Sequence, residues 1–135
     1  LNPSWSTSKN VEEALVNLTD LSPSQRKNRI AELMEQTGLS KSLLDTPVRK
    51  LSGGEQRRLA LLRSLSISPE FLILDEVTAG LDLISTEAVL QLLEKYEQEH
   101  DCAYLVITHD IQVASRLCEV ICEIEHGKFT KKAVR

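Results

Sequence analysis

"LSGGEQRRLALLRSLSISPEFLILDE" (residues 51–76) joins two segments of different character. The first segment carries leucines at helical spacing behind two adjacent glycines, and the last six residues form a short apolar run that ends in two carboxylates. Such a run is typical of a strand that is buried on both faces of a parallel sheet. The stretch therefore predicts a helix followed by a buried strand, which is the alternation of α/β proteins.

The start of the predicted helix contains a capping box and also two adjacent glycines, which capping does not explain. Ser52 and Glu55 have the spacing of a capping box, in which the two side chains satisfy free backbone N–H groups of the first turn. Capping does not require two successive glycines, which cost backbone entropy. Paired glycines do let exposed N–H groups approach a phosphate closely, with the positive end of the helix dipole behind them. We therefore interpret Ser52, Gly53 and Gly54 as a phosphate-contacting helix start.

Helix and strand patterns alternate through the rest of the chain. A long helix is predicted over residues 85–100 and a second buried strand over residues 103–110, "AYLVITHD". A short helix over residues 111–118, a third strand over residues 119–125 and a tight turn at His126–Gly127 complete the pattern. Since α/β proteins place their sites at the carboxyl ends of their strands, we look for function there.

The segment before this alternation is predicted to contain helices without strands between them. A first helix is predicted to begin at an N-cap on Ser8, and a second to begin with a capping box at Ser22 and to end at Gly38. We therefore divide the chain into a helical subdomain, residues 1–66, and the C-terminal part of an α/β core, residues 67–135.

The two strand ends carry the residues that suggest chemistry. An apolar strand that ends in Asp75 and Glu76 is how a P-loop NTPase places a magnesium-side aspartate and a neighbouring base that polarises water. His109, at the end of the next strand, is placed to hydrogen-bond a terminal phosphate or to hold the attacking water. The simpler alternatives are a solvated acidic turn and a structural histidine.

Composition bounds the class of protein. The chain has 135 residues, 41% hydrophobic and 27% charged, with a formal net charge of -4, which describes a globular domain with no overall attraction to nucleic acid or anionic lipid. No apolar run approaches the roughly 20 residues that span a bilayer, so a role at a membrane requires partner chains. Three cysteines, without a secretory leader, favour reduced thiols.

One group of metal-binding residue types has regular spacing. Cys118, Cys122 and His126 lie four residues apart. We favour a buried core segment here over a metal site, because cysteine is among the most buried residue types.

Taken together and in order, these segments resemble the ATP-binding cassette (ABC) ATPases. "LSGGEQRR" resembles the family's signature, "FLILDE" its Walker B strand, "TAGLD" its D-loop and "VITHD" its switch-histidine segment. The resemblance covers essentially the whole chain, and four motifs in the right order are far more specific than any one of them. The opening "LNP" and the helical lobe resemble the peptide/nickel importer branch.

The resemblance implies roles for the helix start. Ser52, Gly53 and Gly54, assisted by Glu55 or Gln56, would contact the γ-phosphate of an ATP molecule that a different subunit holds. The phosphate-contacting helix start of this chain would therefore bind the nucleotide of a second ABC ATPase subunit.

The resemblance also implies roles for the strand ends. Asp75 would serve the Mg²⁺ ion, Glu76 would be the general base and His109 the switch, while Asp82 would carry signals across the dimer. The intact protein would be an ATPase that uses ATP and Mg²⁺, lies on the cytoplasmic face of the membrane and drives permease subunits that import peptides or nickel. No nucleic acid partner is expected.

The chain contains neither G-x-x-x-x-G-K-[S/T] nor the Q-loop, both of which precede this region in the family. We expect that truncation removed them, and that the 135-residue chain alone neither holds ATP nor turns it over.

Two other classes of protein remain. The DNA-maintenance ATPases of the SMC and double-strand-break repair type also carry these motifs in their C-terminal halves. In those proteins a long coiled coil would precede the signature motif, whereas this chain has short capped helices with Pro23 and Pro47 there. The other is an ABC-like binding module without catalysis, which the sequence upstream of Leu1 would distinguish.

Overall fold

The computed structural model describes residues 1–133 and confirms an α/β fold. In chain order its elements are α1 (Thr7–Leu18), α2 (Pro23–Gln36), the short 3₁₀ helices η1 (Lys41–Leu43) and η2 (Val48–Lys50), α3 (Gly53–Ser66), β1 (Phe71–Asp75), α4 (Leu83–Glu99), β2 (Ala103–Ile107), α5 (Ile111–Leu117), β3 (Val120–Glu125) and β4 (Lys128–Ala133).

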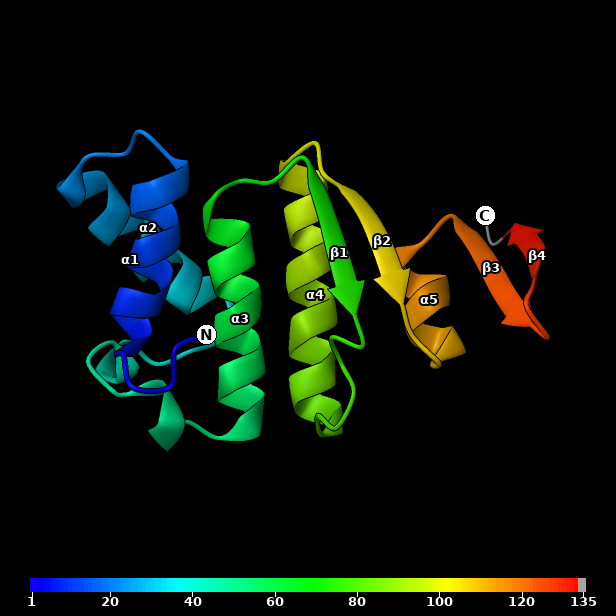
Figure 1. Cartoon of the computed structure of the whole chain (residues 1–135), viewed down its shortest axis with the longest axis horizontal. Coiled ribbons are helices and arrows are strands. Elements are labelled where there is room, and N and C mark those ends of the chain that lie inside the picture. The colour runs from blue at the N-terminus through cyan, green and yellow to red at the C-terminus, as the bar shows by residue number, and fades with distance from the viewer. Residues whose placement is uncertain (134–135) are drawn as a thin grey trace.

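The elements form consecutive layers along the long axis of the molecule. Helices α1, α2 and α3 pack together at one end, α4 lies behind the β1–β2 pair, and α5 and the β3–β4 hairpin lie at the other end (Figure 1). One hydrophobic cluster runs through these layers from Val11 to Leu117. The proposed division of the chain at residue 66 stays a prediction.

Two of the three N-caps that the sequence predicted are confirmed. The capping boxes at Ser22 and Ser52 are both formed. The predicted cap of α1 at Ser8 is wrong, because Ser6 takes this position and its hydroxyl accepts a hydrogen bond from the Lys9 amide at 3.2 Å. Tertiary contacts select Ser6, since it bridges to Pro47, and the Thr7 amide donates to the Thr46 carbonyl at 3.0 Å.

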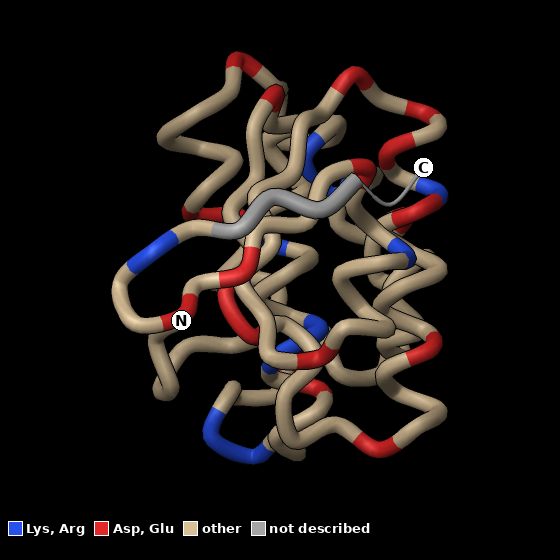
Figure 2. The backbone as a smooth tube through the Cα atoms, turned by 90° about the vertical axis from the view of Figure 1, so that its right-hand side faces the viewer, with Lys and Arg blue, Asp and Glu red and all other residues tan. Residues whose placement is uncertain are grey.

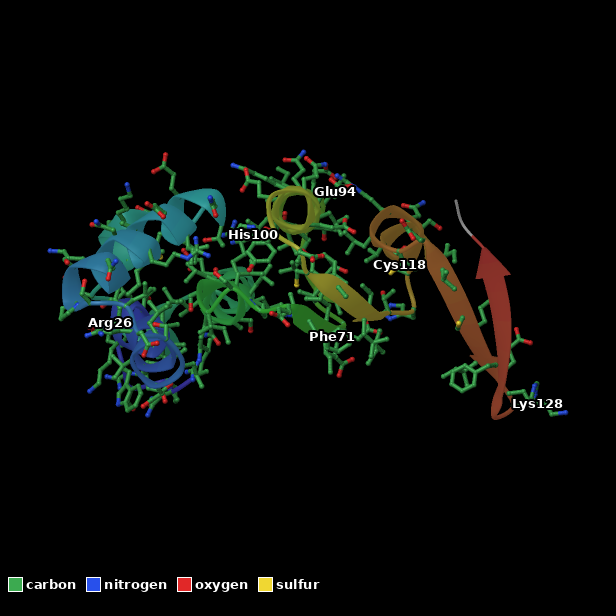
Figure 3. The ribbon with its side chains drawn as sticks, turned by 90° about the horizontal axis from the view of Figure 1, so that it is seen from above. Arg26, Phe71, Glu94, His100, Cys118 and Lys128 are labelled. Carbon is green, nitrogen blue, oxygen red and sulfur yellow. The ribbon has the colours of Figure 1, made fainter. Side chains whose placement is uncertain are left out.

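The two central strands pair in parallel, with Phe71 opposite Ala103 and Asp75 opposite Ile107. The prediction that they are buried on both faces is wrong for this chain. In β1, Leu72 is buried against the α4 side, whereas Ile73, which points the other way, is 59% exposed. The reason is that α4 covers one face of the pair, and nothing in the described part of the chain covers the other (Figure 3).

The third strand exists but does not join this sheet. β3 pairs with β4 in an antiparallel hairpin through the turn at His126–Gly127, where both residues have positive φ. A cleft of about 850 Å³ separates β3 from β2. Cys122 is exposed beside this cleft, contrary to the expected core segment, and residues 1–133 contain no group of three metal-ligating side chains.

Among residues 1–133, no helix has both the length and the apolar character needed to cross a bilayer.

The burial pattern of α4 gives a test of this packing. Leu93 on α4 is fully buried, so Leu93→Ala should lower the free energy of unfolding by about 2–5 kcal/mol through lost contacts and the resulting cavity. Leu83→Ala on the same helix should change it by about 0.5 kcal/mol or less, because Leu83 is 85% exposed. Urea denaturation measures both, and equal effects would contradict the packing of α4.

Candidate functional site

The strands β1 and β2 end opposite each other, and each is followed by a loop at the same edge of the sheet. The Glu76 amide donates a hydrogen bond to the Ile107 carbonyl at 2.9 Å, which extends the parallel ladder by one bond past the end of β1. Glu76 itself has φ +49, in the left-handed region that residues other than glycine seldom adopt. Backbone strain of this kind is common at functional sites.

This turn brings the two predicted strand-end residues together. The Glu76 Oε1 atom lies 2.9 Å from the Nδ1 atom of His109. Both side chains reach solvent, with 82% of the His109 side chain and 38% of the Glu76 side chain exposed. The hydrogen bond with Glu76, and then its negative charge, raise the pKa of His109 above the ordinary histidine value. The structure thus places a carboxylate and an imidazole in contact on an open surface.

Asp75 lies beside this pair as the last residue of β1. Its side chain is exposed, and it makes no hydrogen bond or ion pair with any other residue in the described part of the chain. A free carboxylate at a strand end is a suitable ligand for Mg²⁺, which usually takes one or two protein carboxylates and completes its shell with phosphate oxygens and water. Asp75 therefore fits a metal that arrives with a phosphate ligand.

At the start of α3, the capping box engages Ser52 and Glu55. The Glu55 amide donates to the Ser52 hydroxyl at 3.2 Å, and Oε2 of Glu55 accepts from the Ser52 amide at 2.7 Å. The Ser52 hydroxyl also donates to Oε2 at 2.8 Å, and the bonds that the Ser52 amide and hydroxyl donate to this carboxylate lower the pKa of Glu55. Gln56 also bonds within the chain, since its Nε2 donates to the Leu51 carbonyl at 3.0 Å. The two side chains predicted to assist at a phosphate are therefore already used by the helix start.

The two glycines differ in their surroundings. A Cβ atom on Gly54 would lie 3.6 Å from the Leu81 side chain and 3.9 Å from the Ser85 hydroxyl, which is ordinary van der Waals contact with the start of α4. A Cβ atom on Gly53 would meet nothing within 4 Å. Packing within the described chain therefore requires a glycine at neither position, and Gly53 has the more open surroundings of the two.

Asp82 has a structural role that the sequence reasoning missed. It is the N-cap of α4 and accepts hydrogen bonds from the Ser85 amide and the Ser85 hydroxyl, both at 2.9 Å. These bonds lower the pKa of Asp82. The D-x-x-S spacing was the signal for this cap. Because Ser85 also lies beside Gly54, the starts of α3 and α4 are neighbours.

Arg57 is another site residue that sequence reasoning did not single out. It lies one turn into α3, and its Nη1 donates to the Glu76 carbonyl at 3.5 Å. The same side chain lines a groove of about 390 Å³ between α3 and β1 that also includes Asp75 and Glu76. Arg57 thus joins the twin-glycine helix to the strand end within one molecule.

A parallel strand pair that is covered by a helix on one face and has acidic and imidazole groups beyond its carboxyl ends is the architecture of a partial P-loop NTPase core. The model of a family described as "ABC transporter" matches residues 1–79. The chain is 33% identical over 134 residues to the nickel import ATP-binding protein NikE of Escherichia coli K12, a match that covers 99% of this chain and 50% of that protein.

Solved structures agree with this assignment. The dimeric structure of a bacterial ABC transporter cassette matches with a TM-score of 0.86 and 31% identity, over 98% of this chain and 58% of that one. An ATP-binding cassette dimer with bound ADP and phosphate matches with a TM-score of 0.87 and 30% identity, over 98% of this chain and 58% of that one. The chain belongs to the ABC transporter family. It spans about half the length of the curated relatives it matches.

The contact between Glu76 and His109 predicts a pH dependence. Since it raises the pKa of His109 in the folded chain, it stabilises the fold below the ordinary histidine pKa, and this stabilisation is lost as the pH rises through the raised value. Glu76→Gln removes the negative charge, so the pKa of His109 should fall toward the ordinary value in an NMR titration. An unchanged His109 titration in E76Q would contradict the contact.

Proposed function

We propose that this chain is part of the ATP-hydrolysing subunit of an ABC importer, comprising the signature helix and the strand ends that carry out hydrolysis. The observation that supports this proposal most directly is the 2.9 Å contact between Glu76 and His109, next to the free carboxylate of Asp75. These are the three residues that the family resemblance assigns to the reaction, and they lie at one edge of the sheet.

The strand ends have the chemistry that phosphoryl transfer to water needs. In this proposal Glu76 is the general base, and its carboxylate accepts a proton from the attacking water. His109 is the switch that contacts the terminal phosphate, and its hydrogen bond to Glu76 holds the imidazole next to the carboxylate that takes the proton of the water. Asp75 would hold Mg²⁺, which supplies charge stabilisation when it is bound with ATP.

The start of α3 would serve a second nucleotide. A Cβ atom on Gly53 would have open space around it, and the positive end of a 14-residue helix dipole lies at this position. We infer that Ser52, Gly53 and Gly54 contact the γ-phosphate of an ATP molecule that another ABC ATPase subunit holds. Asp82 would carry signals between the two subunits from its position at the start of α4.

The remaining partners follow from this role. Permease subunits would carry the transported substrate, and the ATPase would lie against them at the cytoplasmic face of the membrane. The relatives named as nickel import proteins favour nickel as cargo over peptides. Acidic and basic residues are interspersed along the chain in Figure 2, which supports the expectation that it binds no nucleic acid.

The relatives are about twice as long as this chain, and the half that it does not span would supply the loop that holds ATP. We propose that a strand from that half fills the cleft between β2 and β3, since both strands line it and are not bonded to each other. This strand would end beside Glu76 and His109.

Substitution of the proposed base tests the reaction. In the intact protein, Glu76→Gln should preserve ATP affinity and lower the rate of hydrolysis by 10²-fold or more, because the water loses its proton acceptor. The protein should then accumulate as an ATP-bound dimer in size-exclusion chromatography. His109→Ala should likewise lower hydrolysis while sparing affinity. Undiminished turnover in E76Q would remove Glu76 from the role of base.

The composite nature of the site predicts the behaviour of the chain by itself. The 135-residue chain should show no saturable binding of ATP with Mg²⁺ in calorimetry at sub-millimolar concentration, because the described residues include no phosphate-holding loop. Tight binding would mean that the nucleotide site is misplaced.

A further inference from the structure

The Glu76–His109 contact lies on an open surface, which raises the question of what keeps it in place. With 82% of the His109 side chain exposed, water competes for the hydrogen bond, and an exposed pair of this kind holds its two side chains together only weakly. The geometry therefore depends on the backbone that carries each residue.

The two residues are supported in different ways. Glu76 is held to the sheet by the hydrogen bond that its backbone amide donates to the Ile107 carbonyl. His109 lies in the short link between β2 and α5, so its position is set by the end of β2 and by the start of α5. Asp110 caps α5 by accepting a hydrogen bond from the Gln112 amide at 2.8 Å.

Helix α5 has little hydrophobic anchorage. It has seven residues, of which Val113 and Leu117 are the buried ones, and Ile111 is 56% exposed. A helix of two turns is not stable by itself in water. One side of α5 also lines the open cleft between β2 and β3. A polar attachment to the body of the chain would add to the packing of these two side chains.

Arg116 provides this interaction. Its Nε and Nη2 atoms donate to the Glu94 carboxylate at 2.6 and 2.9 Å, and its Nη1 and Nη2 atoms donate to the Glu87 carboxylate at 2.6 and 3.0 Å. Glu87 and Glu94 are two turns apart on one face of α4, and Figure 3 shows Glu94 on the side of α4 toward α5. The Arg116 side chain is only 31% exposed. Bidentate bonds between a guanidinium and carboxylates are strong and fix orientation.

Helix α4 is the common support of both strand ends. It begins at the cap on Asp82, shortly after Glu76 in the chain. It also holds β2, because the Tyr104 hydroxyl donates to the Leu93 carbonyl at 2.9 Å. Through Arg116, the helix that follows His109 is bonded to the same element.

We propose that Arg116 is a positioning residue for His109: by fixing α5 to Glu87 and Glu94, it keeps the imidazole within reach of the Glu76 carboxylate. The functional meaning of this inference rests on the proposed function, whereas the contact itself can be measured in the 135-residue chain.

The test replaces Arg116 by Met, which keeps the apolar part of the side chain and removes the four hydrogen bonds. In an NMR titration of the 135-residue chain, R116M should lower the pKa of His109 toward the ordinary histidine value. R116K keeps the positive charge but not the bidentate hydrogen bonds of the guanidinium, so the pKa of His109 should take an intermediate value. K95M is the matched control, because Lys95 is an exposed basic residue of α4 that pairs with Glu99 at 3.7 Å. It should leave His109 as it is.

A merely structural role for Arg116 would lower stability without changing the titration of His109 in the folded chain. A folded R116M chain with the wild-type His109 pKa would therefore overturn the proposal. Should R116M not fold, E94Q and R116K carry the same test, and unchanged His109 titration in both would overturn it equally.

The activity of the intact protein separates this inference from the proposed function. R116M should lower kcat on the order of tenfold with little change in KM, since misplacement of a reacting group costs rate rather than binding. If R116M moves the His109 pKa but His109→Ala leaves hydrolysis intact, the link to Arg116 stands and the proposed function of His109 fails.

Discussion

The hydrogen bond from the Glu76 amide to the Ile107 carbonyl sets the geometry on which the rest of the site depends. It continues the β1–β2 ladder past the last strand residue, so both chains leave the sheet at the same level. Side chains alternate between the faces of a sheet, and a slip of one residue would exchange the buried and exposed faces. Leu72 and Leu74 buried on one side of β1 fix this register. The contact of Glu76 with His109 is a consequence of it.

A second constraint arises where two helices begin side by side. Gly54 packs against Leu81 and Ser85, so the start of α3 is held next to the cap of α4. Arg57 then reaches from α3 to the carbonyl of Glu76. The helix proposed to meet one nucleotide and the carboxylate proposed to act on another are thus in contact within one chain. This physical connection would let events at one nucleotide affect the other.

The sequence predicted the local features well because local rules determine them. Capping boxes at Ser22 and Ser52, the parallel strands and the convergence of Glu76 and His109 all follow from short-range spacing and from the geometry of parallel sheets. Burial of Ile73 was predicted wrongly, since the exposure of a sheet face depends on which elements cover it. The cap of α1 on Ser6 depends on distant contacts with residues 46 and 47. The bonds of Arg116 to Glu87 and Glu94 link separate helices, and no spacing rule indicates them.

A cis–trans test of two substitutions in the intact dimer addresses the composite site most directly. Gly53→Asp puts a negative charge where a phosphate would lie, and its Cβ has free space, so the fold should tolerate it. If each site combines Glu76 of one subunit with Gly53 of the other, a dimer with E76Q in one subunit and G53D in its partner keeps one complete site. It should therefore retain about half of the ATPase activity, whereas a dimer with both changes in one subunit should be inactive. The opposite pattern would show that each site is built within a single chain and would contradict the account.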